Sequence, residues 1–136
     1  MPSCLLDTNH ASPLVTLEHP LRARILAAGA SGDLFCIATP CIAEAVFGFG
    51  LLPRAEANRR NWSLLRPQLI IYTVAADDAE LAADLRIELR RQGWQLDLVD
   101  ALVAAIALRR ELTVLTTDQD FERVPNLRTE NWLRVS

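Results

Sequence analysis

Four acidic residues are the strongest chemical feature of this sequence: Asp7, Glu44, Asp100 and Asp118. Each lies next to an apolar stretch, at the start or end of an expected strand or helix. Carboxylates that come together raise one another's pKa unless a positive group sits between them. A hard divalent cation, Mg²⁺ or Mn²⁺, is the natural neutraliser, and such a site suits hydrolysis of phosphodiester bonds.

Each acid also has a simple structural explanation. A solvated turn would account for Asp7, since aspartate is a common turn residue. Asp97 is a plausible N-cap with Asp100 three residues further on, and Asp118 and Asp120 could cap a short helix at 119–124. Glu44 is harder to explain, because an unpaired charge on a mostly apolar helix is costly and needs a partner or a cation. Singly these explanations suffice, but jointly the four acids favour a functional site.

Alternating strands and helices predict how the acids are positioned. Strands are expected over 3–7, 34–38, 69–74 and 112–116, with a final extended piece over 127–132. Helices are expected over 21–30, from Thr39 as N-cap with Pro40 at the first helical position, and over 53–65, 77–92 and 98–110. The last of these is apolar on almost every side and should be internal. This order predicts an α/β fold with a mainly parallel sheet covered by helices on both faces.

In such a sheet, ligands bind beyond the carboxyl ends of the strands. Asp7 and Asp118 follow strands, and Glu44 lies in the first turns of a helix that leaves a strand end. Asp100 opens the helix that runs back before the 112–116 strand, so that its N-terminus points to the same edge. We therefore expect all four acids to meet at one edge of the sheet.

Composition narrows the class of protein. The 136 residues carry a net charge of −3 and are 51% hydrophobic, which predicts one globular domain over residues 1–136. No apolar run is long enough to span a membrane and no signal peptide is evident, so a cytoplasmic protein is expected. The three cysteines are expected to be small buried hydrophobes. His10 lies near Asp7, but a surface position is favoured for it.

All fourteen basic residues are arginines, and lysine is absent. The lack of lysine excludes haloacid-dehalogenase-like phosphatases, receiver domains and P-loop ATPases, which all require one. A basic run occurs where Glu56 is the only acid, at Arg54, Arg59, Arg60 and Arg66. Such a run is usually a solvated helix face, but these arginines could also bind RNA phosphates.

Four motifs in order resemble the PIN-domain ribonucleases: LLDTN, IAEAVFGFG, DALVAAIAL and VLTTDQDF. Within that family the sequence is most similar to VapC-type toxins of bacterial type II toxin–antitoxin pairs. The likeness extends over nearly the whole chain, including VPNLRTENW near its end. Each motif alone is weak, but the ordered set, with eighteen residues from Asp100 to Asp118, is specific.

The resemblance implies a three-layer α/β/α PIN sandwich that cleaves RNA with metal-activated water. It implies that Asp7, Glu44, Asp100 and Asp118 are the quartet that binds Mg²⁺ or Mn²⁺. It further implies that Asn9 and Thr116 orient the site and that Asp120 is a supplementary acid. Asp97, one turn before Asp100, is a competitor for the metal role. The implied partners are an RNA substrate, a small antitoxin whose C-terminal segment blocks the site, and a second copy of the chain.

Two alternatives remain open at this point. One is a non-catalytic PIN-like module that binds RNA or protein, against which the intact acidic quartet argues. The other is a DNA-cleaving or structure-specific nuclease of the same fold. The short chain, without insertions to hold a branched substrate, makes a small ribonuclease the better interpretation.

Overall fold

The computed structural model describes residues 3–133, which form a twisted sheet between two layers of helices. The strands are β1 (Ser3–Leu6), β2 (Leu34–Ala38), β3 (Ile70–Tyr72), β4 (Thr113–Leu115) and β5 (Thr129–Glu130). Their order in the sheet is β3-β2-β1-β4-β5, and every neighbouring pair is parallel. All carboxyl ends therefore lie at one edge of the sheet, with β1 in the middle.

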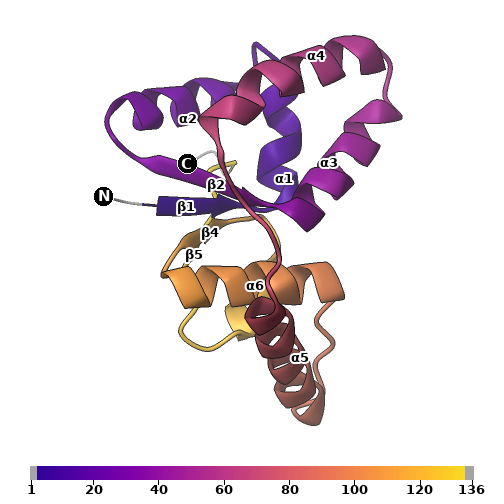
Figure 1. The fold of residues 1–136 in the computed structure, drawn as a ribbon, viewed down its shortest axis with the longest axis vertical. Helices are drawn as coiled ribbons and strands as arrows, with labels where there is room; N and C mark the ends of the chain where they lie inside the picture. The colour runs from indigo at the N-terminus through magenta and orange to yellow at the C-terminus, as the bar shows by residue number, and fades with distance from the viewer. Residues whose placement is uncertain (1–2, 134–136) are drawn as a thin grey trace.

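The helices cover both faces of the sheet, which confirms the predicted fold class (Figure 1). On one side lie α1 (Thr8–Ala11), α2 (Pro20–Ala30), α3 (Thr39–Gly50) and α4 (Ala55–Leu65). On the other side lie α5 (Ala76–Arg91) and α6 (Leu98–Arg110). Three 3₁₀ segments link these elements among the described residues: η1 (Ser12–Val15), η2 (Arg66–Gln68) and η3 (Gln119–Arg123).

The residues at the centre of the sheet are fully buried. Leu5, Leu6 and Leu115 have no exposed surface, as expected for parallel strands that are covered on both faces. Helix α6 lies directly against the sheet and buries Ala101 and the continuous run 103–107, which confirms that it is internal. The cysteines Cys4, Cys36 and Cys41 are buried and free, as predicted. No helix within residues 3–133 is long and apolar enough to cross a bilayer.

Helices α2 and α5 begin one residue earlier than predicted, at Pro20 and Ala76, and the starts of α3 and α4 differ for reasons of local geometry. Helix α3 begins at Thr39 itself, with Ala38 in the N-cap position and no side-chain cap, so the prediction of Thr39 as N-cap is wrong. Helix α4 begins at Ala55 rather than at Pro53, because Arg54 adopts a left-handed conformation with φ of 68°. A residue in that region interrupts the helical backbone and sets the turn between α3 and α4.

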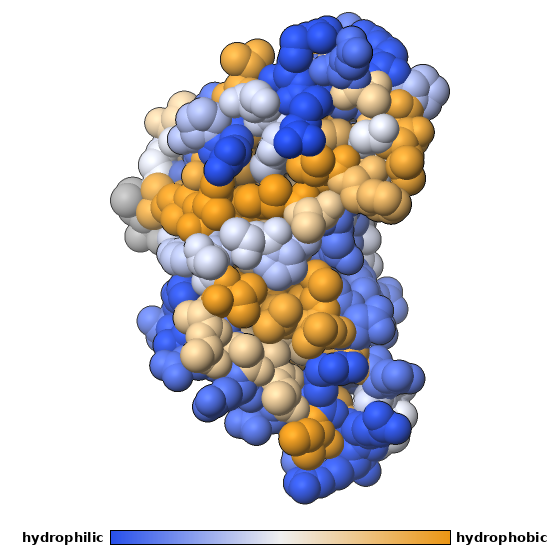
Figure 2. Space-filling model, turned by 45° about the vertical axis from the view of Figure 1, so that its right-hand side comes forward, coloured by the Kyte–Doolittle hydropathy of each residue, from blue (hydrophilic) through white to orange (hydrophobic). Residues whose placement is uncertain are grey.

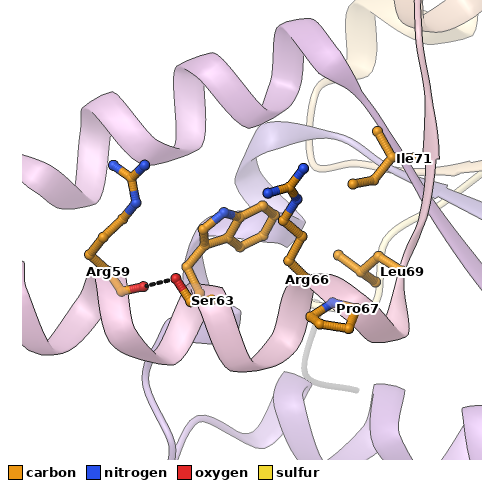
Figure 3. Close-up of a pocket in the computed structure, with 7 residues that line it drawn as sticks. Arg59, Ser63, Arg66, Pro67, Leu69 and Ile71 are labelled. Carbon is orange, nitrogen blue, oxygen red and sulfur yellow. Dashed lines mark hydrogen bonds between the residues drawn. The ribbon is translucent and has the colours of Figure 1, made fainter.

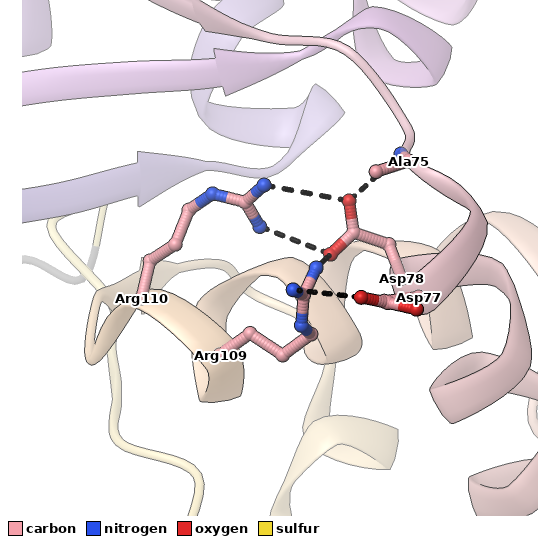
Figure 4. A network of polar contacts seen from close by, with 5 residues as sticks. All are labelled: Ala75, Asp77, Asp78, Arg109 and Arg110. Atoms are coloured by element: carbon pink, nitrogen blue, oxygen red, sulfur yellow. Dashed lines mark hydrogen bonds and ion pairs between the residues drawn. The ribbon is translucent and has the colours of Figure 1, made fainter.

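A buried ion cluster fastens the outer helix α5 to the end of α6 (Figure 4). The carboxylate of Asp78 has no exposed surface and accepts hydrogen bonds from the guanidinium groups of Arg109 and Arg110. It also accepts from the backbone N–H of Ala75 at 2.9 Å. Burial alone would raise the pKa of Asp78, but these donors outweigh it and lower the pKa to about 2. The guanidinium of Arg110 also lies over the ring of Tyr72, 4.6 Å from its centroid, which links the cluster to β3.

We expect Asp78→Ala to lower the free energy of unfolding by about 2 kcal/mol, because both arginines and the Ala75 N–H lose their acceptor. The loss is smaller than for a fully buried pair, since the arginine side chains are 36% and 26% exposed and water can solvate them. Urea unfolding measures the difference. The control is Asp77→Ala, whose carboxylate is 77% exposed and pairs with Arg109 at 3.5 Å. Equal losses for the two variants would contradict a structural role for the buried cluster.

Candidate active site

The predicted acids lie around the carboxyl end of β1, where the chain order reverses. Strands β2 and β4 flank β1 on opposite sides, so the loops that follow them diverge at this point, which is where open α/β sheets bind ligands. Asp7 directly follows β1, and Asp118 lies three residues beyond the end of β4. Glu44 is in the second turn of α3, which begins where β2 ends, and Asp100 is in the first turn of α6. The predicted placement at one edge of the sheet therefore holds.

Asp7 is the best-defined acid of the site. Its side chain is 5% exposed and caps α1 by accepting a hydrogen bond from the backbone N–H of Thr8 at 2.9 Å. Its second oxygen accepts from the Thr116 hydroxyl at 2.7 Å and from the Asn9 amide at 3.1 Å. Asn9 and Thr116 thus hold Asp7 by hydrogen bonds, and their part in the function of the site stays a prediction. Burial still raises the pKa of Asp7, and the charges of Asp118 and Glu44 add to the increase.

The Thr116 hydroxyl ties the two central strand ends together. It donates to Asp7 and accepts from the Asn9 amide at 3.3 Å and from the backbone N–H of Asp118 at 3.0 Å. One donor and two acceptor positions are all that a hydroxyl has, so Thr116 has no further capacity. The segment that carries Asp118 is therefore held in register with Asp7.

His10 extends this network into the interior, and the expectation that it lies on the surface is wrong. It has no exposed surface, and its Nε2 accepts a hydrogen bond from the backbone N–H of Trp132 at 3.0 Å. The proton of the neutral imidazole therefore lies on Nδ1, which donates to Asn9 Oδ1 at 2.7 Å. Because Asn9 Oδ1 is occupied in this way, the Asn9 amide nitrogen faces Asp7. No local pattern could have revealed this link, since Trp132 lies 122 residues away in the sequence.

The side chain of Glu44 lies in a different environment from the one that its sequence neighbours predicted. It lies on the exposed side of α3 rather than among the apolar residues that surround it in sequence. Its Oε1 accepts a hydrogen bond from the Thr8 hydroxyl at 2.7 Å, a contact that the sequence did not suggest. Helical spacing explains the difference, because the buried residues of α3 are Cys41, Ala45 and Phe49, which lie on another face.

The pKa of Asp100 is raised by burial and by the charges of neighbouring acids. Burial raises its pKa, the negative charges of Asp7, Asp118 and Asp97 raise it further, and the result is a pKa of about 7. The thiol of Cys41, beneath the site, has a pKa of about 12 because of burial and the charges of Asp7, Glu44 and Asp100. The four predicted acids thus share one region of strong negative potential.

Helix capping, the structural explanation predicted for several acids, is found for Asp118 but not for Asp97. Asp118 does act as a cap, since its Oδ1 accepts from the backbone N–H of Asp120 at 2.9 Å at the start of η3. Asp97 occupies the N-cap position of α6 but makes no capping hydrogen bond, and its side chain is exposed. The side chain of Asp120 is exposed as well. Capping therefore explains part of the role of Asp118 and nothing of the role of Asp100.

The site acids have no positive neighbour within the described chain. The ion pairs found across residues 3–133 involve Asp77, Asp78 and Glu88 and none of the four site acids. Over the same residues, no three His, Cys, Asp or Glu side chains are grouped closely enough to hold a metal ion as they are placed. The acids are therefore mutually repelling neighbours, with oxygen donors of the type that hard divalent cations prefer.

The four predicted RNA-binding arginines do not form one surface with the acids. Arg54 is at the turn before α4 and Arg60 is exposed on α4, whereas Arg59 and Arg66 line a groove with Trp62, Ser63, Pro67, Leu69 and Ile71 (Figure 3). None of the site acids lines this groove. It borders the amino end of β3, and in a parallel sheet that end lies opposite the carboxyl ends where the acids are. A role of these arginines in binding RNA stays a prediction.

Comparison with known proteins agrees with the fold and shows the family. The family model "PIN domain" matches residues 4–127, so the chain belongs to the PIN-domain family. It is 26% identical to ribonuclease VapC2 of Rickettsia felis, covering 94% of this chain and 96% of that protein. It is 31% identical to the tRNA(fMet)-specific endonuclease VapC of Shigella flexneri, over 71% of this chain and 74% of that protein.

Solved structures give the same result. The chain superposes on the crystal structure of VapBC2 from Rickettsia felis bound to a promoter DNA fragment, with a TM-score of 0.83 and 25% identity over 96% of this chain and 98% of that chain. DNA-bound VapBC from Salmonella typhimurium gives a TM-score of 0.82 and 25% identity over 97% and 99% of the two chains. The predicted PIN fold and the likeness to VapC-type proteins are both confirmed.

Proposed function

We propose that this chain, as one PIN domain over residues 1–136, is a metal-dependent endoribonuclease and the toxin of a type II toxin–antitoxin pair. The observation that carries the proposal is the set of four acids around the carboxyl end of β1, where burial and neighbouring charges raise the pKa values of Asp7 and Asp100. The related proteins that are named ribonucleases and a tRNA endonuclease support RNA as the substrate. We also propose a cytoplasmic location, where such a toxin would meet cellular RNA.

The proposed ligands of Mg²⁺ or Mn²⁺ are Asp7, Asp100, Asp118 and Glu44, with Asp97 and Asp120 at the rim. A bound divalent cation supplies a water of lowered pKa and polarises a phosphoryl oxygen. The protein's own part is to hold the carboxylates in place. Hydrogen bonds from Thr116 and Asn9 keep one oxygen of Asp7 oriented, and the Thr8 hydroxyl orients Glu44. Asp100, with a pKa of about 7, is the carboxyl group whose charge depends most on a neutralising ion.

Exposed apolar surface supports a protein partner, the proposed antitoxin or a second copy of the chain. The hairpin of α3 and α4 exposes Phe47 by 70%, Leu51 by 70%, Leu52 by 58% and Leu64 by 71%. Figure 2 shows hydrophobic surface over both helical layers, with a paler band between them. Large exposed apolar patches on a protein surface mark sites of protein interaction.

We expect the purified protein to cleave RNA in Mg²⁺ or Mn²⁺ and to lose this activity completely in excess chelator, because the repelling carboxylates cannot act without a cation. Initiator tRNA is the first RNA to test, since two relatives are named for it, followed by a structured RNA pool. Gel analysis of end-labelled RNA gives both the rate and the cut positions. Adding back each metal after chelation shows which ion restores cleavage.

The negative results of this experiment separate the alternatives. Cleavage at the same rate in chelator would rule out the proposed role of the metal. An absence of both cleavage and metal binding would instead favour the non-catalytic RNA- or protein-binding module. DNA substrates in the same assay test the remaining alternative, a DNA-cleaving nuclease of the same fold.

A further inference from the structure

A tryptophan in the loop before α6 is exposed and stacked against an arginine. Trp94 lies in the loop 92–97 between α5 and α6, and its side chain is 42% exposed. The guanidinium carbon of Arg123 lies 3.5 Å from the centroid of the Trp94 ring. The other two tryptophans, Trp62 and Trp132, are buried or half-buried in the fold. Trp94 is thus the tryptophan that offers aromatic surface to a ligand.

The loop that carries Trp94 has a defined shape. Its second residue is Gly93, which has a φ of +86° that other residues rarely adopt. It is held to α5 by Arg86, whose Nε donates to the backbone carbonyl of Leu96 at 3.0 Å. Trp94 is therefore presented on an ordered turn.

A hollow of about 260 Å³ adjoins the indole, and both charged residues that line it are arginines, Arg86 and Arg90. Within residues 3–133, no carboxylate pairs with Arg86, Arg90 or Arg123. The hollow thus combines an aromatic wall with positive charge that the protein does not neutralise. That combination fits a base and its phosphate, since bases stack on aromatic rings and guanidinium planes.

Short chain segments connect the stack to the residues that carry the acids. Trp94 is three residues before Asp97, which is a reach of at most about 11 Å for an extended chain. Arg123 is at the end of η3, which Asp118 caps, and the five 3₁₀ steps from Asp118 to Arg123 span about 10 Å. The two segments that carry Asp100 and Asp118 therefore each contribute one member of the stack. A nucleotide next to the cleaved phosphate would be within reach of it.

We infer that Trp94 and Arg123 form a stacking platform for an unpaired base of the RNA next to the cleavage point, with Arg86 and Arg90 binding the adjoining phosphates. This inference rests on the proposed function, because it concerns the same site and substrate. RNA is favoured over a protein partner here because arginines line the hollow, whereas the most exposed apolar side chains lie on α3 and α4. The platform makes unpaired bases near the cut a determinant of substrate choice.

The test compares two probes of equal length, oligoadenylate and an oligomer of abasic sugar phosphates, titrated against Asp100→Asn protein so that cleavage does not interfere. We expect Trp94→Ala, added to that variant, to weaken oligoadenylate binding by about 5- to 100-fold and to change abasic binding by less than about twofold. Trp94→Phe keeps a stacking ring and should retain most of the affinity. Unchanged oligoadenylate affinity in Trp94→Ala, or an equal loss for both probes, would overturn the platform.

A charge-matched pair of variants tests Arg123. Arg123→Ala should weaken oligoadenylate binding more than Arg128→Ala, which removes the same charge next to the amino end of β5, at the opposite edge of the sheet. Equal effects of the two variants would also overturn the platform.

Failure of the platform can be told apart from failure of the proposed function. If the wild type cleaves RNA and Trp94→Ala cleaves it equally well, only the platform is wrong. If the wild type cleaves nothing, the titrations still decide whether the platform exists.

Discussion

Replacing Asp100 by asparagine is expected to reduce RNA cleavage by about a thousandfold or more, because it removes one carboxylate from the set proposed to hold the cation. The asparagine side chain has nearly the size and shape of aspartate, so the change is one of charge and ligand strength. The measurement is single-turnover cleavage of the RNA identified in the metal assay, with protein in excess. Circular dichroism of the same sample establishes that the fold is intact.

The same substitution should stabilise the metal-free protein, and the pH range follows from the pKa of Asp100. The folded-state pKa of about 7 lies above the ordinary value of 3.8, so between these values the folded protein binds more protons than the unfolded chain. The wild type therefore loses stability as pH rises through this range. Asp100→Asn does not titrate and should be more stable by about 1 kcal/mol at about pH 7.5 without metal, after allowance for partial exposure.

Asp97→Asn is the matched control for both effects. Asp97 lies one turn before Asp100, is exposed, and raises the pKa of Asp100 through its charge. If it is only a neighbour, Asp97→Asn should keep cleavage within about tenfold of the wild type. Two results would contradict the assignment: wild-type cleavage by Asp100→Asn, or an equal loss in Asp97→Asn, which would make Asp97 the ligand.

The fold could be predicted from the sequence because the apolar patterns of single segments and the alternating order of strands and helices indicate the same parallel α/β fold. The apolar runs of β1 and β2 and the uniformly apolar α6 are long enough to identify buried elements from sequence alone. Boundaries were less accurate, since the expected strand over 69–74 is β3 at Ile70–Tyr72 and the expected helix from Pro53 begins at Ala55. The left-handed conformation of Arg54 explains the second difference, and arginine carries no sequence signal for it.

For the site, placement was predictable but contacts were not. Strand ends and helix starts placed Asp7, Glu44, Asp100 and Asp118 at one edge, because parallel strands share their direction. The hydrogen bonds from Thr8 to Glu44 and from Trp132 to His10 join residues 36 and 122 positions apart. Such contacts depend on how the helical layers pack against the sheet in the folded protein. The role of the arginines likewise depends on the direction of α4, which separates Arg66 from the acids.

The buried imidazole of His10 should make the protein sensitive to acid. Burial lowers its pKa to about 4, and the charge of Arg24 adds to this effect. Protonation would also put a second N–H on Nε2, which faces the Trp132 backbone N–H at 3.0 Å. The unfolded chain binds the proton near pH 6.5 and the folded protein only near pH 4. Stability from neutral His10 is thus complete above about pH 6.5 and is lost as pH falls towards 4, by roughly 3 kcal/mol in all.

His10→Gln tests this, because glutamine can accept from the Trp132 N–H and does not titrate. We expect the wild type to lose about 2 kcal/mol more than His10→Gln between about pH 7 and pH 5, as measured by urea unfolding without metal. Asp100 titrates in both proteins with the opposite slope, so the difference between them isolates His10. His19→Gln, at the half-buried N-cap of α2, is the control and should follow the wild type. If His10→Gln lost stability in parallel with the wild type, the bond between His10 and the C-terminal segment would not depend on a neutral imidazole. Asn9 would then have to be oriented towards Asp7 by the Thr117 N–H, which donates to its Oδ1 at 3.2 Å.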